Sequence, residues 1–85
     1  MNNVLLRKIT LTTQFQPLSM KQSEVLSVTV HLPSGNKQDV IFLGENGTEV
    51  PWEPGTQFRL TKVNLSEISV KGRANDLVIL AGGTW

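Results

Sequence analysis

Apolar and polar residues alternate along much of this chain, and a period of two residues predicts β-strands. The alternation is clearest in residues 24–32, where every second residue from Leu26 to Leu32 is leucine or valine and a serine, a threonine and a histidine lie between them. This segment is predicted to be a strand with one buried face. Weaker forms of the pattern predict strands at residues 4–13, 57–61 and 68–71, and residues 48–50 are predicted to form a further short strand.

Two short segments are apolar without alternation. Val40–Leu43 is apolar on both faces of an extended chain, which indicates either a central strand between two layers or a strand whose outer face is covered by a partner. Leu77–Ala81 is the last predicted strand. Residues 82–85, Gly-Gly-Thr-Trp, are expected to be a flexible end.

Turn signals separate these strands. Pro33–Lys37 is predicted to join the strands on its two sides into a hairpin. Asn46-Gly47 predicts a second hairpin, because this dipeptide tolerates the positive φ of tight β-turns. Pro54-Gly55 fits the two central positions of a type II turn. Residues 64–68 favour a corner with at most one helical turn, capped by its asparagine or serine.

Six or seven short strands separated by turns predict an all-β fold with almost no helix. The expected architecture is a small antiparallel β-sandwich, jelly-roll-like or a partly open barrel. At 85 residues the chain is one domain, residues 1–85, since a second core would be too small to fold. The longest connection, residues 14–23, is expected to lay Phe15, Leu18 and Met20 against the edge of the core.

Composition narrows the class of function. The chain has no cysteine, so it is not a disulfide-stapled secreted domain. Its net charge is +1 with the two signs interleaved, which predicts neither nucleic acid nor an anionic membrane as a partner. The longest apolar run, Leu77–Ala81, is too short to cross a bilayer as a helix. The N-terminal residues lack the pattern of a secretory signal, which predicts cytoplasmic synthesis without export.

No pattern in the sequence predicts an active site. The single histidine, His31, has no cysteine with which to build a zinc site, and the seven carboxylates fall mostly at turns and strand ends, where water solvates them. None of the serines stands in the glycine-flanked elbow of a nucleophile. We therefore expect no enzyme activity, no cofactor and no bound metal.

Aromatic and arginine side chains are the candidates for contact with a partner, because protein interfaces are enriched in both. Trp52 lies in a turn, where it either packs on the rim of the core or anchors a partner. Trp85 follows two glycines, so a neighbouring chain would have to hold it in place. The predicted interface has three aromatic anchors and three arginines at the rim, namely Trp52, Trp85, Phe42, Arg7, Arg59 and Arg73.

Residues 51–72 carry a resemblance to a known family. A proline-glycine turn is followed by an apolar strand, by the corner V-N-L-S-E-I at residues 63–68, and by a short strand that ends in Lys71-Gly72. This arrangement resembles a recurring pattern in short all-β virion proteins of tailed bacteriophages. Ser69 departs from the pattern, since an aromatic residue is common at that place, and residues 1–50 carry no resemblance.

The resemblance implies a virion structural protein, made in the cytoplasm of the host bacterium. Within this class, the resemblance first implies a capsid decoration (cement) protein, which would bind the major capsid protein and form a homotrimer. A receptor- or carbohydrate-binding module of a phage tail or head fibre is the alternative. A regulatory or inhibitor protein that binds a host partner is a third class that the sequence leaves open.

Overall fold

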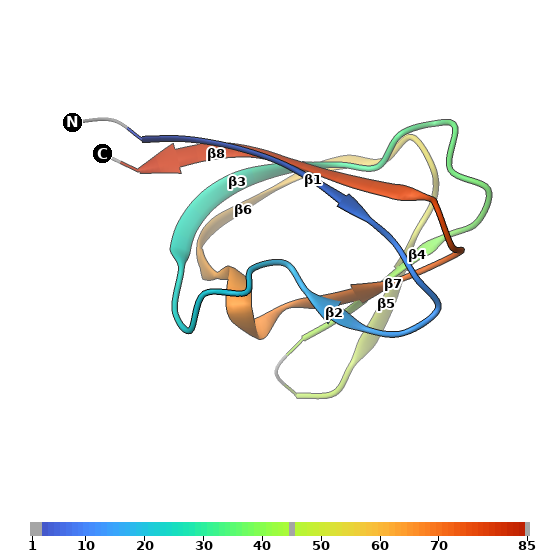
Figure 1. The fold of residues 1–85 in the computed structure, drawn as a ribbon, viewed down its shortest axis with the longest axis horizontal. Coiled ribbons are helices and arrows are strands. Elements are labelled where there is room, and N and C mark those ends of the chain that lie inside the picture. Colours follow the sequence, from blue (N-terminus) through green and yellow to red (C-terminus); the bar gives the residue numbers. More distant parts are fainter. Residues whose placement is uncertain (1–2, 45, 85) are drawn as a thin grey trace.

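A computed structural model of the chain describes residues 3–44 and 46–84. The described part folds into two four-stranded antiparallel sheets and confirms the predicted all-β sandwich (Figure 1). One short 3-10 turn, η1 (Leu65–Glu67), interrupts the strands. The strands are β1 (Asn3–Thr10), β2 (Gln16–Pro17), β3 (Val25–His31), β4 (Val40–Leu43), β5 (Glu49–Trp52), β6 (Gln57–Asn64), β7 (Ser69–Lys71) and β8 (Leu77–Thr84).

The two sheets differ in strand length. Sheet A has the order β1-β8-β3-β6 and contains the four longer strands, which run along the top of Figure 1. Sheet B has the order β2-β7-β4-β5 and lies beneath it. No helix in the described residues is long and apolar enough to span a membrane.

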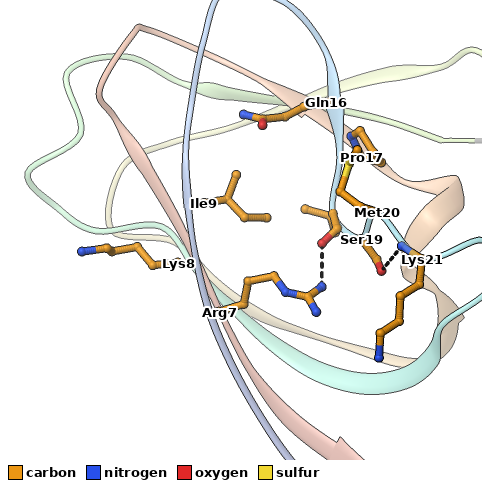
Figure 2. Close-up of a pocket in the computed structure, with 9 residues that line it drawn as sticks. Arg7, Lys8, Ile9, Gln16, Pro17, Ser19, Met20 and Lys21 are labelled. Atoms are coloured by element: carbon orange, nitrogen blue, oxygen red, sulfur yellow. Dashed lines mark hydrogen bonds between the residues drawn. The ribbon is translucent and has the colours of Figure 1, made fainter.

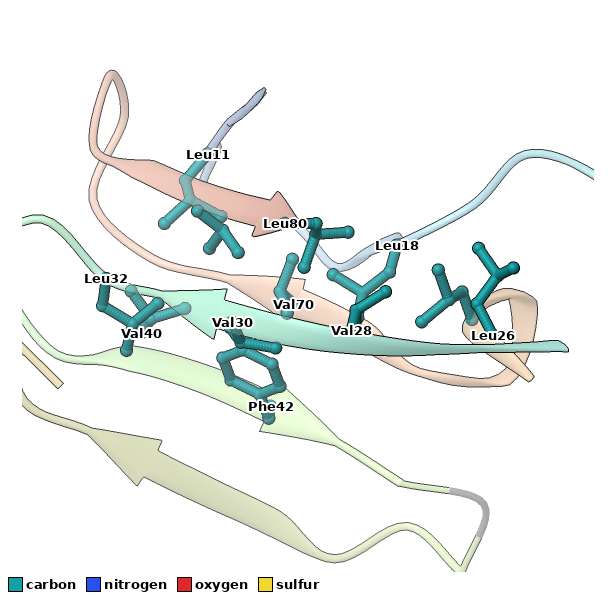
Figure 3. Packing of buried hydrophobic residues seen from close by; sticks show 12 residues of the cluster. Leu11, Leu18, Leu26, Val28, Val30, Leu32, Val40, Phe42, Val70 and Leu80 are labelled. Atoms are coloured by element: carbon teal, nitrogen blue, oxygen red, sulfur yellow. The ribbon is translucent and has the colours of Figure 1, made fainter. Parts of the chain in front are cut away.

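The core lies between the sheets and is made of leucine, valine and one phenylalanine. Leu26, Val28 and Val30 of β3 point inward and are buried, as the alternation predicts. Figure 3 shows side chains of both sheets meeting in this layer. The buried cluster consists of Leu11, Leu18, Leu26, Val28, Val30, Leu32, Val40, Phe42, Leu65, Val70, Val78 and Leu80.

The β4 strand does not lie between two layers of the described chain, which was the first alternative for its two apolar faces, and cover of its outer face by a partner stays a prediction. It is a central strand of sheet B, between β7 and β5, and Val40 and Phe42 point into the core. Ile41 and Leu43 point away from the core and are half-buried. Within the described chain, therefore, β4 has one face in the core and one half-covered outer face.

Two glycine turns have the predicted geometry. Gly55 has a φ of 86°, and the N–H of Thr56 donates to the carbonyl of Glu53 at 3.2 Å, which closes the turn before β6. Gly47 has a φ of 79° in the loop that joins β4 to β5 in a hairpin. Both turns are local structures, which explains why the sequence predicts them.

The hairpin prediction for Pro33–Lys37 was wrong. The turn itself forms, with the N–H of Asn36 donating to the carbonyl of Pro33 at 3.1 Å. However, β3 pairs with β6 and β8 in sheet A, while β4 pairs with β5 and β7 in sheet B. The turn carries the chain from one sheet to the other, because a turn sets a change of direction but not the sheet in which the next strand pairs.

Two polar side chains hold that crossover in place. Asp76 is buried, and its Oδ2 accepts hydrogen bonds from the N–H groups of Lys37 at 2.8 Å and Gln38 at 3.2 Å. The amide of Asn36 donates to the carbonyl of Leu77 at 2.9 Å and accepts from its N–H at 2.8 Å. These bonds replace the backbone pairing that the crossover lacks.

The expectation of a flexible end was wrong for residues 82–84. They continue β8, which pairs with β1 through Asn3–Thr84 and with β3 through Ser27–Gly83. Trp85 lies outside the described residues. A Cβ on Gly82 would lie 2.3 Å from the carbonyl oxygen of Ser27 and 2.9 Å from Cα of Val28, so this position has no room for a side chain. The glycine therefore permits the close approach of β3 and β8.

The connection between β1 and β3 contains one short strand and only partly follows its prediction. Leu18 is buried in the core, as expected. The prediction for Met20 was wrong, since 89% of its surface is exposed. Phe15 is half-buried and lies under the ammonium group of Lys71, with 4.6 Å between the nitrogen and the ring centre.

Candidate interaction surfaces

The sandwich has two open sides, because each sheet ends in two edge strands. The edge strands β1 and β2 lie on one side, and β5 and β6 lie on the other. A hollow lies on each side between the two sheets. We call them the β1–β2 cleft and the β5–β6 groove.

The β1–β2 cleft has a volume of about 490 Å³ and a mixed basic and apolar lining. Figure 2 shows the guanidinium of Arg7 pointing across the cleft towards the segment after β2. The lining residues are Arg7, Lys8, Ile9, Gln16, Pro17, Leu18, Ser19, Met20 and Lys21.

Arg7 ties the two walls of this cleft together. Its Nη1 donates to the carbonyl of Leu18 at 2.8 Å and to Oε1 of Glu24 at 3.0 Å. The other carboxylate oxygen of Glu24 lies 3.2 Å from Nζ of Lys21. Arg7 is therefore engaged within its own chain, although 28% of its side chain still faces solvent.

The surroundings of Glu24 change its acidity. Burial raises the pKa of its carboxyl, but hydrogen bonds with Ser19, Arg7 and Lys21 and the charge of Arg7 lower it, and the net result is a pKa below the ordinary 4.5. The folded state therefore favours the charged carboxylate. Its contribution to stability is present above pH 4.5 and is lost as the pH falls through the lower folded-state pKa.

Replacement of Glu24 by glutamine is expected to lower the free energy of unfolding by about 1–3 kcal/mol at neutral pH, because it weakens hydrogen bonds to a charged group. The variant should also lose less stability than the wild type between neutral pH and about pH 3. Urea unfolding at a series of pH values measures both effects. The exposed Glu67 in η1 provides the control, and a Glu67→Gln variant with the same flattened pH profile would contradict the assignment.

The β5–β6 groove has a volume of about 310 Å³ and is almost wholly apolar at its base. The rings of Trp52 and Phe58 are stacked with centres 4.4 Å apart and an angle of 19° between them. Phe42 meets Phe58 edge-on at 5.6 Å. The lining residues are Phe42, Leu43, Gly44, Asn46, Thr48, Val50, Trp52, Phe58, Leu60 and Ile68.

The groove is open because β5 is a short edge strand. Val50 and Trp52 lie on its inner side, opposite Phe42 and Val40 of the neighbouring strand. Sheet A ends at β6, so no further strand of that sheet covers them from the opposite side; 41% of Val50 is exposed and Trp52 is half-buried. Leu60 and Ile68, which also line the groove, are half-buried. Large apolar side chains thus remain within reach of solvent along one side of the molecule.

The six predicted interface residues do not form one continuous surface in the structure. Trp52 and Phe42 come together through Phe58, but Phe42 is buried and belongs to the core. Arg7 lies on the opposite side, in the β1–β2 cleft. Arg59 is exposed on the outer face of sheet A, where it donates to Oγ1 of Thr29, and Arg73 is exposed between β7 and β8. Trp85 lies outside the described residues.

Several exposed apolar residues were not among the predicted contacts. The side chains of Leu6, Met20, Val25 and Val50 are 78%, 89%, 57% and 41% exposed. The sequence gives no sign of this exposure: Leu6 and Val25 stand in predicted strands, and Met20 was expected to lie against the edge of the core. Only the strand order shows that they lie at edges or on outer faces.

The one histidine lies at the end of a strand. His31 ends β3 and is half-buried, and its Nδ1 is buried without a hydrogen-bond partner in the described chain. Within residues 3–44 and 46–84, no group of three histidine, cysteine, aspartate or glutamate side chains is close enough to hold a metal ion.

Comparison of the chain with protein-family models, with curated protein sequences and with solved structures finds no match. The resemblance of residues 51–72 to phage virion proteins therefore remains a prediction. A functional proposal has to rest on the two open sides of the sandwich.

Proposed function

We propose that this protein acts through contact with other proteins and carries out no chemistry. The β5–β6 groove carries this proposal, because it leaves a half-buried tryptophan and several aliphatic side chains within reach of solvent on one side of an 85-residue domain. Apolar side chains that gather on one side of a domain are candidates for contact with another protein. Tryptophan is the residue most enriched among the contacts that dominate binding energy.

Within that class, we propose a structural protein of a tailed-phage virion, and specifically a capsid decoration protein that forms homotrimers on the major capsid protein. The resemblance of residues 51–72 supports this choice, and the sandwich fold is compatible with it. A protein that binds only the assembled shell stabilises that shell by mass action. Repetition of a moderate contact by symmetry strengthens the effect through effective concentration.

Mass spectrometry of purified phage particles tests the virion proposal. The chain is expected in the particles, in a copy number that is a multiple of three for each capsid. Particles stripped of it should release their DNA at a lower temperature, and re-addition of the protein should restore the wild-type value. Absence of the chain from purified particles would exclude a structural role in the virion.

A receptor- or carbohydrate-binding module of a tail or head fibre is the second candidate. The groove favours it in one respect, since Asn46 and Thr48 bring an amide and a hydroxyl close to Trp52. An apolar wall with a few polar groups is the usual composition of a small-ligand site. A glycan array separates the candidates: saturable binding that Trp52→Ala abolishes would favour the fibre module, and no binding would favour the decoration protein.

A further inference from the structure

The two open sides of the sandwich have complementary shapes. On the β1–β2 side, Met20 projects into solvent with 89% of its surface exposed, while Leu6 of β1, 78% exposed, lies on the outer face of sheet A. On the β5–β6 side lies an apolar hollow with Val50 and Leu60 in its lining. One side therefore offers a projecting apolar side chain, and the opposite side offers a groove that could bury it.

The two sides also differ in charge. The β1–β2 cleft is lined by Arg7, Lys8 and Lys21, and the carboxylate that faces them, Glu24, is already bonded to Arg7 and Lys21. The surface therefore keeps an excess of positive charge, and Lys8 is exposed.

The segment around the β5–β6 groove is acidic. No lysine or arginine occurs between Lys37 and Arg59, whereas four carboxylates do. Glu49 on β5 and Glu53 just after it are exposed at the edge of sheet B. The cations on β6 are Arg59, which bonds to Thr29 on the outer face of sheet A, and Lys62, which is exposed at an irregularity of the strand. Glu49 alternates with Val50 and points to the outer face of sheet B, so β5, the edge strand beside the groove, carries exposed negative charge next to the groove but not in its lining.

These charges disfavour a two-fold contact in which a surface meets its own copy. Two β1–β2 clefts face to face would bring Lys8 and Lys21 against the same residues, and two grooves would bring Glu49 and Glu53 against theirs. Like charges across an interface cost several kcal/mol. Contact between the β1–β2 side of one copy and the β5–β6 side of another brings opposite charges together instead.

We propose that the occupant of the β5–β6 groove is a second copy of this chain, which inserts Met20 between Val50, Leu60 and Trp52 and places Lys8 and Lys21 beside Glu49 and Glu53. The contact is head-to-tail, so each copy uses its β1–β2 side for one neighbour and its β5–β6 side for another. Such contacts close into a ring when the rotation between copies permits. The inference deepens the homotrimer proposed above and rests on the contact function.

Two variants, each with one blocked side, test the arrangement. Met20→Asp blocks the projecting side and leaves the groove intact, while Val50→Asp blocks the groove and leaves the projecting side intact. In sedimentation equilibrium of the full chain at about 100 μM, a contact with a Kd below about 10 μM is mostly occupied. We expect association of the wild type and a monomer of 9.4 kDa for each variant alone.

An equimolar mixture of the two variants is the decisive sample. The intact groove of Met20→Asp should accept the intact Met20 of Val50→Asp, which gives one contact and stops at a dimer of two different chains. A two-fold contact would give no such rescue, because both partners of every pair would need the same intact surface. A wild type that stays monomeric, or a mixture that stays monomeric, would overturn the inference.

Val25→Asp is the matched control, because Val25 is 57% exposed on the outer side of β3 and lies in neither surface. It should associate as the wild type does, and monomers of this variant would also overturn the inference. Far-UV circular dichroism verifies that each variant is folded. If Val50→Asp is not, Glu49→Lys replaces it, since Glu49 is exposed on β5, the edge strand beside the groove.

The inference and the virion proposal fail in different experiments. If purified particles lacked the chain but the mixed dimer still formed, the virion proposal would be excluded and the head-to-tail contact would stand. A wild-type monomer in sedimentation would exclude the head-to-tail contact even if the chain were abundant in particles.

Discussion

Replacement of Gly82 by valine is expected to lower the free energy of unfolding by about 3 kcal/mol, as a side chain forced into closely packed surroundings does. The physical reason is the contact with β3: a Cβ would lie 2.3 Å from the carbonyl oxygen of Ser27 and 2.9 Å from Cα of Val28. Both obstacles are backbone atoms, which cannot turn aside as a flexible side chain could. Urea denaturation followed by circular dichroism would show the loss as a lower midpoint.

Gly35 provides the matched control for this variant. It is exposed in the turn after β3, and an added Cβ there would meet nothing within 4 Å. Gly35→Ala should therefore change the free energy of unfolding by no more than about 0.5 kcal/mol. Equal stability of Gly82→Val and the wild type would mean that β8 does not lie against β3 at this position.

Replacement of Phe42 by alanine is expected to cost about 3–5 kcal/mol of stability. Phe42 is 7% exposed and meets Phe58 edge-on across the core, so the substitution removes buried apolar surface and leaves a cavity. In a domain of this size, such a loss is a large part of the total stability. Chemical denaturation measures it directly.

The same strand carries the control. Ile41 precedes Phe42 in β4 but points to the outer face of sheet B, where it is half-buried. Ile41→Ala should cost about 1 kcal/mol, because a partly exposed side chain loses less burial and leaves no closed cavity. If the two variants lost equal stability, the direction assigned to the faces of β4 would be incorrect.

The sequence predicts some buried residues of this protein but not others. The alternation around residues 24–32 is enough to predict β3 and its buried face, since a strand places successive side chains on opposite sides. The sequence does not show whether Phe42 is a core residue or a contact anchor. That distinction depends on β6, which brings Phe58 against it from the other sheet.

The turns were likewise predicted correctly in some respects and wrongly in others. Gly47 and Gly55 are correctly predicted because a positive φ is a local steric requirement that glycine meets without strain. Pro33–Lys37 forms its turn but not the predicted hairpin, because the flanking strands find partners far away in the chain. The chemistry of a turn contains no information on those partners.

The candidate surfaces are the least predictable part. Met20 was expected at the edge of the core and projects from it, and the β5–β6 groove joins residues from Phe42 to Ile68 that no spacing in the sequence connects. Burial is set by which strands end up at the edges of the two sheets. That order is decided by packing over the whole domain.

The sequence alone therefore determined the all-β class, the positions of most strands and the turns that need glycine, because all three follow from side-chain alternation and the φ and ψ angles of single residues. The tertiary structure decided the sheet in which each strand pairs, the closeness of β3 and β8 at Gly82, and the two open sides of the sandwich. These features arise from contacts between residues distant in the chain, which local preferences do not specify.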